Sequence, residues 1–85
     1  MEKISIMGIK IGDRVNNSKV VQEILTEYGC SIKTRLGLQE VGNDGCSRAG
    51  LIILELVGDS DKWNELKSRL EKLSGVEVQD MKFDL

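Results

Sequence analysis

Two cysteines are the only soft metal ligands in this chain of 85 residues, and it contains no histidine. A structural zinc site needs four ligands, usually cysteine and histidine, so Cys30 and Cys46 do not make one. No histidine is present to activate a serine or cysteine nucleophile, and the glycines form neither a G-x-G-x-x-G fingerprint nor a P-loop. We therefore expect no metal site, no cofactor and no catalytic residue, and we interpret the chain as a protein other than an enzyme.

The two cysteines are expected to differ in exposure. Cys30 follows a predicted helix and starts a predicted strand, which favours its burial as a small apolar side chain. Cys46 belongs to a long polar loop, where a thiol near Arg48 would be exposed and more reactive. A redox-sensing role for Cys46 is a weaker alternative to that of an ordinary loop cysteine.

The turn between the first predicted strand and the first predicted helix could hold a small ligand. It reads Gly12-Asp13-Arg14-Val15-Asn16-Asn17 and combines backbone N–H groups at the positive end of a helix with charged and amide side chains. The candidate effector-binding residues are Gly12, Asp13, Arg14 and Asn16. A tight turn and a helix N-cap would use the same residues, and the pattern fits that interpretation at least as well.

Apolar residues with a period of two predict four strands, over residues 3–12, 30–38, 49–58 and 76–83. The first and third strands are apolar on both faces. In the last strand Val76 and Val78 share one face, whereas Met81 and Phe83 share the other. This switch predicts either a bulge near residues 79–80 or a strand buried on different faces at its two ends.

Apolar stripes with helical spacing predict two helices. The first begins among residues 16–18 and runs to Tyr28, and Gly29 is expected to end it in the left-handed conformation. The second is capped at residues 59–60 and stops at Gly75. The order β-α-β-β-α-β is that of the ferredoxin-like plan, of class α+β.

In this plan both helices cover one face of a four-stranded antiparallel sheet with the strand order 4-1-3-2. That order places the two strands with the most apolar residues on both faces in the centre of the sheet. We expect residues 1–85 to form a single domain with this βαββαβ sandwich architecture.

The sheet face without helices would still be apolar, whichever face the helices cover. A contiguous apolar patch of this kind is typical of an interface, so we expect a homo-oligomer that pairs through this face or through a sheet edge. The candidate interface residues, taken from both faces of the two central strands, are Ile4, Ile6, Ile9, Leu51, Ile53 and Leu54.

Composition excludes several classes of partner. The net charge of −2 and the absence of a basic stripe argue against direct nucleic-acid binding, and the central strands lack the aromatic residues that stack on RNA bases. The longest apolar run, residues 49–54, is far shorter than the roughly 20 residues that cross a membrane. Residues 1–4 show no signal-peptide pattern, so we expect a cytoplasmic protein.

Three segments carry a resemblance to a known family: Arg35-Leu36-Gly37-Leu38, the run Leu51-Ile52-Ile53-Leu54-Glu55-Leu56, and the final pattern Leu66-x3-Leu70-x2-Leu73-Ser74-Gly75-Val76-x-Val78-x2-Met81-x-Phe83. Together they resemble the regulators of the iron-only hydrogenase system, a family of short stand-alone ACT-like domains. The resemblance covers nearly the whole chain.

The resemblance implies a ferredoxin-like fold related to ACT domains and to the C-terminal domain of the nickel-responsive repressor. It implies dimers or tetramers built through the sheets, and a link to hydrogenase maturation or expression. In ACT domains the first turn and the subunit interface bind small effectors, which points here to Gly12, Asp13, Arg14 and Asn16. The chain departs from the nickel repressor because it has no histidine and no DNA-binding element before its first strand, so nickel binding and direct repression of a promoter are not expected.

The leading hypothesis is a non-enzymatic regulatory module, an ACT-like homo-oligomer that binds a small-molecule effector or a hydrogenase-system protein. The alternative is a structural or assembly partner for a hydrogenase maturation enzyme, with no small ligand.

Overall fold

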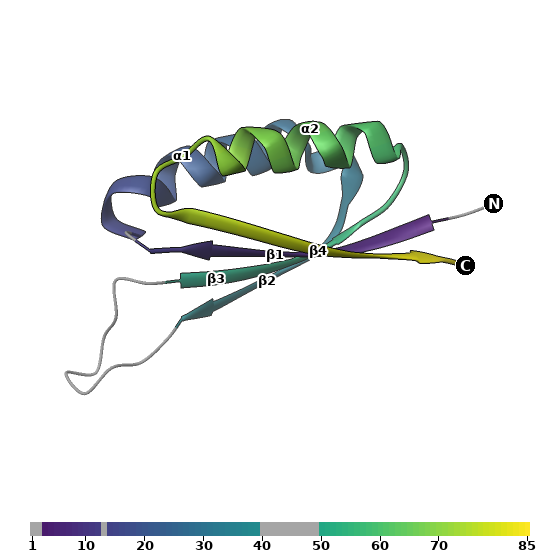
Figure 1. Ribbon diagram of the computed structural model, residues 1–85, viewed down its shortest axis with the longest axis horizontal. Helices are drawn as coiled ribbons and strands as arrows, with labels where there is room; N and C mark the ends of the chain where they lie inside the picture. Colours follow the sequence, from purple (N-terminus) through teal and green to yellow (C-terminus); the bar gives the residue numbers. More distant parts are fainter. Residues whose placement is uncertain (1–2, 13, 40–49) are drawn as a thin grey trace.

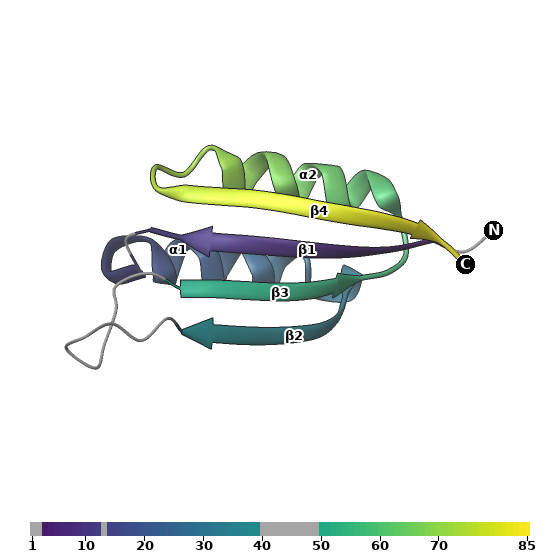
Figure 2. The same cartoon turned by 60° about the horizontal axis from the view of Figure 1, so that its bottom comes forward.

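In the computed structural model, which describes residues 3–12, 14–39 and 50–85, four strands form one antiparallel sheet and two helices lie across one of its faces (Figure 1). Along the chain the elements are β1 (Lys3–Ile11), α1 (Arg14–Glu27), a short 3-10 turn (Gly29–Ser31), β2 (Ile32–Gln39), β3 (Gly50–Leu56), α2 (Ser60–Glu71) and β4 (Val76–Asp84). The strands lie side by side in the order β2-β3-β1-β4, seen face on in Figure 2. This is the predicted order read from the other edge, so the ferredoxin-like α+β prediction is confirmed.

The core lies between the two helices and the sheet face that they cover. Alternate residues of β1 and β3 point into it, because successive side chains of a strand point to opposite faces. The helices contribute the apolar stripes predicted from their spacing. The buried apolar side chains of the two central strands and the two helices are Met7, Ile9, Ile11, Ile52, Leu54, Leu56, Val21, Ile24, Leu25, Trp63, Leu66 and Leu70.

Two of the predicted interface residues belong to this core. The side chains of Ile9 and Leu54 are both 0% exposed and lie under the helices. Their prediction as interface residues is therefore wrong, because strand alternation places them on the covered face. Ile4, Ile6, Leu51 and Ile53 have the opposite parity and point away from the helices.

Helix α1 differs from its prediction at both ends. It begins at Arg14, before the predicted cap, and it ends at Glu27. Gly29 does not adopt a positive φ; instead it opens the 3-10 turn that leads into β2. Cys30 lies in that turn and is exposed, so its predicted burial at the start of a strand is wrong. Within the described residues no helix is long and apolar enough to span a membrane.

Helix α2 begins and ends close to its prediction. Asp59 is its N-cap, and the carboxylate of Asp59 accepts a hydrogen bond of 2.9 Å from the Asp61 N–H. Gly75 follows the helix with a φ of +78°, the left-handed conformation that glycine adopts most readily. The long loop predicted between β2 and β3, with Cys46, lies outside the described residues.

Strand β4 contains no bulge. It pairs with β1 in unbroken register from Ile11 and Val76 to Lys3 and Asp84. The predicted bulge is therefore wrong, and of the predicted burial on two faces only the Val78 end is observed, since Met81 and Phe83 are exposed. Val76 and Val78 face the helices, whereas Met81 and Phe83 face the other way.

Candidate functional site

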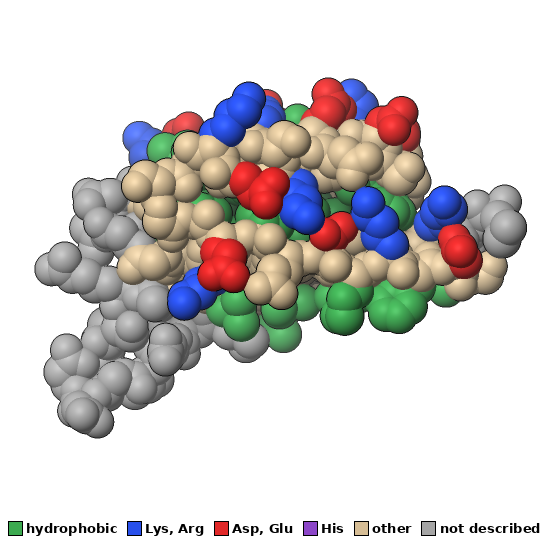
Figure 3. All heavy atoms as spheres, in the orientation of Figure 1, with side chains coloured by type: hydrophobic (Ala, Val, Ile, Leu, Met, Phe, Trp, Pro, Cys, Tyr) green, Lys and Arg blue, Asp and Glu red, His purple; other side chains and the backbone are tan. Residues whose placement is uncertain are grey.

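The sheet face turned away from the helices, which we call the outer face, is the main candidate surface. Figure 2 shows that no helix crosses it, and Figure 3 shows hydrophobic side chains gathered along this underside of the molecule. Strand parity and register assign side chains from all four strands to it. Its described apolar members are Ile4, Ile6, Leu36, Leu51, Ile53, Met81 and Phe83.

The apolar side chains of the outer face form a continuous surface. Ile4 pairs with Phe83 and Ile6 pairs with Met81 across β1 and β4, so their side chains are direct neighbours. Met81 is 58% exposed and Phe83 is 49% exposed. Leu36, on the opposite edge strand, is 53% exposed. The apolar surface therefore extends across the whole width of the sheet.

Charged groups of both signs border this surface. The Lys33 ammonium lies 3.8 Å from the Glu55 carboxylate, which also accepts a hydrogen bond of 3.0 Å from the Thr34 hydroxyl. Lys10 pairs with Glu77 across β1 and β4. A surface with both charges beside an apolar centre is suited to pairing with a copy of itself, because neither sign dominates.

An ion pair on the helix side of β4 fixes which side chains of that strand face outward. The Lys67 ammonium on α2 donates a hydrogen bond of 2.9 Å to the Asp80 carboxylate on β4, and the Asp80 side chain is only 15% exposed. This hydrogen bond holds the pKa of Asp80 below its ordinary value and raises the pKa of Lys67. Because Asp80 is held toward α2, its neighbour Met81 must point to the outer face.

A glycine stands in the middle of the outer face. Gly8 on β1 pairs with Ile53 on β3 and with Gln79 on β4. A Cβ at this position would lie 3.8 Å from Ile53 Cδ1 and 4.0 Å from the Gln79 carbonyl oxygen, which are ordinary contacts. The protomer itself therefore has room for a side chain there. A glycine inside a strand often marks the close approach of another backbone or of a ligand.

The predicted effector-binding turn lies at the end of β1 and is attached to the turn before β4. The Gly12 N–H donates a hydrogen bond of 2.7 Å to the Gly75 carbonyl, and Asn17 Nδ2 donates one of 2.7 Å to the Ser74 carbonyl. A Cβ on Gly12 would come within 3.1 Å of the Gly75 oxygen, so the close approach of the two turns favours glycine. The turn is therefore a structural junction.

The other predicted effector residues are only partly placed. Arg14 and Asn16 belong to the first turn of α1, and their side chains, like all of Asp13, lie outside the described part of the chain. An effector site at this turn stays a prediction. Among the described residues no group of three or more cysteine, aspartate or glutamate side chains is placed to hold a metal ion.

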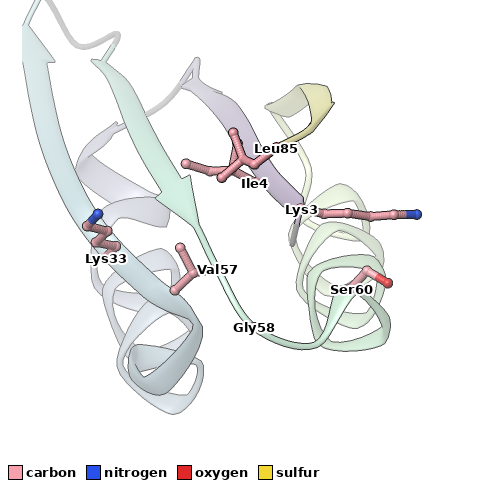
Figure 4. A pocket seen from close by; sticks show the side chains of 7 residues that line it. All are labelled: Lys3, Ile4, Lys33, Val57, Gly58, Ser60 and Leu85. Carbon is pink, nitrogen blue, oxygen red and sulfur yellow. The ribbon is translucent and has the colours of Figure 1, made fainter. Parts of the chain in front are cut away.

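A hollow of about 610 Å³ opens beyond the end of β3, at the opposite end of the sheet from Gly12 (Figure 4). β3 stops pairing with β1 at Leu56, opposite Ser5, whereas β1 and β4 stay paired as far as Lys3 and Asp84. The residues that line the hollow are Lys3, Ile4, Lys33, Val57, Gly58, Ser60 and Leu85.

The backbone of Val57 explains why the hollow is there. Its N–H donates a hydrogen bond of 2.8 Å to the Ser31 carbonyl, and its carbonyl accepts one of 3.0 Å from Trp63 Nε1. These two bonds hold the chain after β3 beside the 3-10 turn and α2, away from Ile4. The sequence predicts that this strand continues to Gly58, which would have filled the gap.

The family of the chain follows from a comparison with family models. The model described as "TM1266-like: Iron-only hydrogenase system regulator, putative" matches residues 3–80. The chain belongs to this family. The resemblance stated from Arg35–Leu38, the third strand and the C-terminal pattern is thereby confirmed.

Solved structures place this regulator family member among ACT-like folds. The uncharacterized protein TM1266 from Thermotoga maritima is 25% identical, with a TM-score of 0.83, and the match covers 99% of this chain and all of that one. The ACT domain from the GTP pyrophosphokinase of Chlorobium tepidum is 19% identical, with a TM-score of 0.66, over 92% of this chain and 84% of that domain. The second likeness shows the fold alone.

A third structure shares the fold at lower similarity. CPII from Thiomonas intermedia K12, a nitrogen regulatory PII-like protein bound to ADP, AMP and bicarbonate, is 16% identical, with a TM-score of 0.54, and 96% of each chain is covered. No curated protein matches this regulator family member with significant similarity.

Proposed function

We propose that this protein is a non-enzymatic, cytoplasmic regulatory module of the iron-only hydrogenase system, which works as a homo-oligomer and responds to a small effector or a protein partner. Membership of a regulator family supports the regulatory role. In this oligomer a second copy of the chain packs against the outer face. Dimers or tetramers both satisfy the proposal.

The observation that carries the proposal is the uncovered outer face. Met81, Leu36 and Phe83 are each about half exposed or more, and they lie on one face of one sheet. Monomeric proteins rarely expose a contiguous apolar surface of this extent, and such surfaces usually mark an interface. A second copy matches the chemistry because a two-fold axis would place the apolar centre on itself and let the bordering lysines and carboxylates meet opposite charges.

Gly8 supports the same occupant. It sits in the apolar centre, where the protomer has space for a side chain but carries none. In a pair of sheets packed face to face, a glycine there lets a side chain of the partner approach the backbone of β1. A large side chain at Gly8 would obstruct that approach and leave the protomer's own packing intact.

An oligomer built through this face can act as a regulator by a simple linkage. An effector that binds one oligomeric arrangement more tightly than another shifts the equilibrium toward the arrangement that it prefers. The free energy of this shift cannot exceed the difference between the effector's binding free energies for the two arrangements. The related CPII protein binds ADP, AMP and bicarbonate. That precedent on the same fold supports a small-molecule effector for this chain.

The assembly is tested by size-exclusion chromatography with light scattering on the whole chain. We expect a mass of at least two copies of the 9.5 kDa chain at micromolar concentration. Met81→Asp, in the outer face, should give a folded monomer, because a desolvated carboxylate would stand in the interface. Val20→Asp is the matched control, since Val20 is an exposed apolar residue on α1, far from the outer face, and it should leave the oligomer unchanged.

A clean 9.5 kDa species for the unaltered chain would overturn the proposal. The effector is sought by thermal-shift measurements with amino acids, nucleotides and divalent metal ions, because a ligand of the folded state raises Tm by mass action. No shift with any of these, together with capture of a hydrogenase maturation enzyme, would instead favour a structural or assembly role without a small ligand.

A further inference from the structure

The hollow beyond β3 is built by fixed backbone and does not depend on a chance side-chain position. Val57 is hydrogen-bonded on both sides, to Ser31 through its N–H and to Trp63 through its carbonyl. The Trp63 side chain is 1% exposed, so this anchor is part of the core. Gly58 then turns away with a φ of +83°, a conformation that L side chains rarely adopt. The backbone position of Val57, on one side of the gap from Ile4, is therefore set by the fold.

The walls of the hollow combine short aliphatic side chains with positive charge. Figure 4 shows Ile4 and Leu85 together on one side and Val57 with Lys33 on the other, while the Lys3 side chain points away from them. Leu85 is 70% exposed, so no described residue covers most of its apolar surface. Among the described residues that line the hollow there is no acidic side chain.

The two lysines are weakly engaged by the protein. The Lys33 ammonium lies 3.8 Å from the Glu55 carboxylate and the Lys3 ammonium lies 4.0 Å from the Asp84 carboxylate, with lysine side chains 66% and 57% exposed. Exposed ion pairs at such distances contribute little to stability. Lys33 can therefore turn from Glu55 toward an anion in the hollow at small cost, and it is the better placed of the two because the Lys3 side chain points away from the other lining residues.

We propose that this hollow, which meets the margin of the outer face at Ile4, binds a small organic carboxylate with a branched aliphatic body, whose carboxylate meets Lys33 and whose body lies between Ile4, Val57 and Leu85. The volume of about 610 Å³ is in the range of small-molecule sites. The inference names the effector site of the proposed regulatory module and in that sense rests on the proposed function. It places the site at the opposite end of the sheet from the first turn and Gly12.

The probe for this site is 4-methyl-2-oxopentanoate, titrated into the 15N-labelled chain and followed by two-dimensional NMR of the backbone amides. We expect saturable shifts centred on Ile4, Lys33 and Gly58, with Gly12 unchanged. Acetate, which keeps the carboxylate but lacks the aliphatic body, should bind at least tenfold more weakly, because each buried methylene contributes about a fourfold gain. The neutral alcohol 4-methyl-1-pentanol should also bind more weakly than the probe.

Two substitutions and a control test the assigned residues. Lys33→Gln should weaken binding of the probe by about threefold to tenfold, the range expected for loss of a partly exposed ionic contact. Leu85→Ala should weaken it by removal of apolar contact, and because the Leu85 side chain is largely exposed, the variant should keep the fold. Lys72→Gln, at an exposed lysine that follows α2, removes the same charge away from the hollow and should leave the affinity unchanged.

Three results would overturn the inference: no saturable shift at millimolar probe, shifts centred on Gly12, or equal affinity in Lys33→Gln and Lys72→Gln. The mass of each sample, measured in parallel, separates this inference from the proposed assembly. A chain that is oligomeric but does not bind the probe contradicts only the assigned site. A monomer that binds the probe with the expected residue dependence contradicts only the assembly through the outer face.

Discussion

The two faces of the sheet have nearly the same apolar content but very different surroundings. On β3, Leu54 is completely buried under the helices, whereas its neighbour Ile53 points to the outer face beside Gly8. The helices cover one face because they carry apolar stripes of matching length. No element in the described part of the chain covers the other face in this way. Apolar side chains on a strand therefore show that a surface is to be buried, but they do not show whether the chain itself or a second molecule buries it.

The largest expected difference between the two faces is in stability. Leu54→Ala should lower the free energy of unfolding by about 3 kcal/mol, because it leaves a cavity in the core. Leu36→Ala, on the outer face, should lower it only as far as it weakens assembly, so its effect should shrink as the protein is diluted. Urea unfolding at two protein concentrations measures the loss of stability in both variants. Equal losses that do not change on dilution would contradict the distinction between the faces.

Gly8 allows the outer face to be obstructed without a change in the core. Gly8→Leu should raise the dissociation constant of the oligomer by about fivefold or more, since overpacking of a close interface costs about 1–3 kcal/mol. Sedimentation velocity across a dilution series measures this constant. Gly37→Leu is the control, because Gly37 lies on the edge strand β2 and a Cβ there meets no atom within 4 Å. Identical dissociation constants for the two variants would refute a close contact at Gly8.

The ion pair that orients β4 predicts a pH-dependent effect on the covered side. Asp80→Asn should lower the free energy of unfolding at pH 7 by about 1 kcal/mol, since it removes a charge-assisted hydrogen bond. The folded-state pKa of Asp80 lies below its ordinary value of 3.8. Its contribution is therefore complete above this value and is lost as the pH falls through the lowered pKa.

The difference between Asp80→Asn and the unaltered chain should consequently become smaller as the pH falls below 3.8. Urea unfolding at a series of pH values measures it. Lys62→Gln is the control, because Lys62 forms an exposed ion pair with Glu65 within α2 and should change stability little. A loss for Asp80→Asn that is the same at pH 7 and pH 2 would contradict the ionic contribution.

The smallest expected effect concerns Ser5, a fully buried polar side chain on the covered face. Ser5 is 0% exposed, and among the described residues its hydroxyl is the buried side-chain oxygen without a hydrogen-bond partner. Ser5→Ala should therefore raise the free energy of unfolding by about 0.5–1 kcal/mol. Ser5→Cys places a weakly polar thiol there, and its free energy of unfolding should lie between those of Ser5→Ala and the unaltered chain. A loss of stability in Ser5→Ala would show that the hydroxyl has a partner.

The fold could be predicted from the sequence because local patterns and the topology agree. The first and third strands are apolar on both faces, and the ferredoxin-like order places both in the centre of the sheet. Trp63, Leu66 and Leu70 follow the helical period and are all buried. Gly75, the predicted stop, lies in the turn after α2, which ends at Glu71, and has the left-handed conformation.

The assignment of faces could not be predicted from the sequence. When both faces of β1 and β3 are apolar, a period of two cannot say which one the helices cover, and the interface prediction therefore included Ile9 and Leu54 in error. The same ambiguity in β4 is resolved by the contact between Lys67 and Asp80, which joins two elements far apart in the chain. Hydrophobic patterns do not contain that information.

Sequence patterns do not predict the hollow, because its position depends on where β3 stops pairing with β1. Val57 continues the alternation of β3, so the pattern extends the strand to Gly58. The actual end at Leu56 is set by the hydrogen bonds of Val57 to Ser31 and Trp63. Cys30 was placed wrongly for a similar reason, since its exposure follows from a 3-10 turn that shortens the next strand. Both errors concern the ends of elements, where backbone geometry decides the outcome.

The pairing of the central strand β1 has a consequence for the kinetics of folding. Its hydrogen-bonding partners are β3 and β4, and Lys3 pairs with Asp84 although almost the whole chain separates them. Contacts so distant along the chain are slow to form, because the entropy of closing the loop is lost before the contact is made. During synthesis one edge of β1 can pair with β3 as soon as β3 has emerged, but its other edge must stay open until the last strand has left the ribosome.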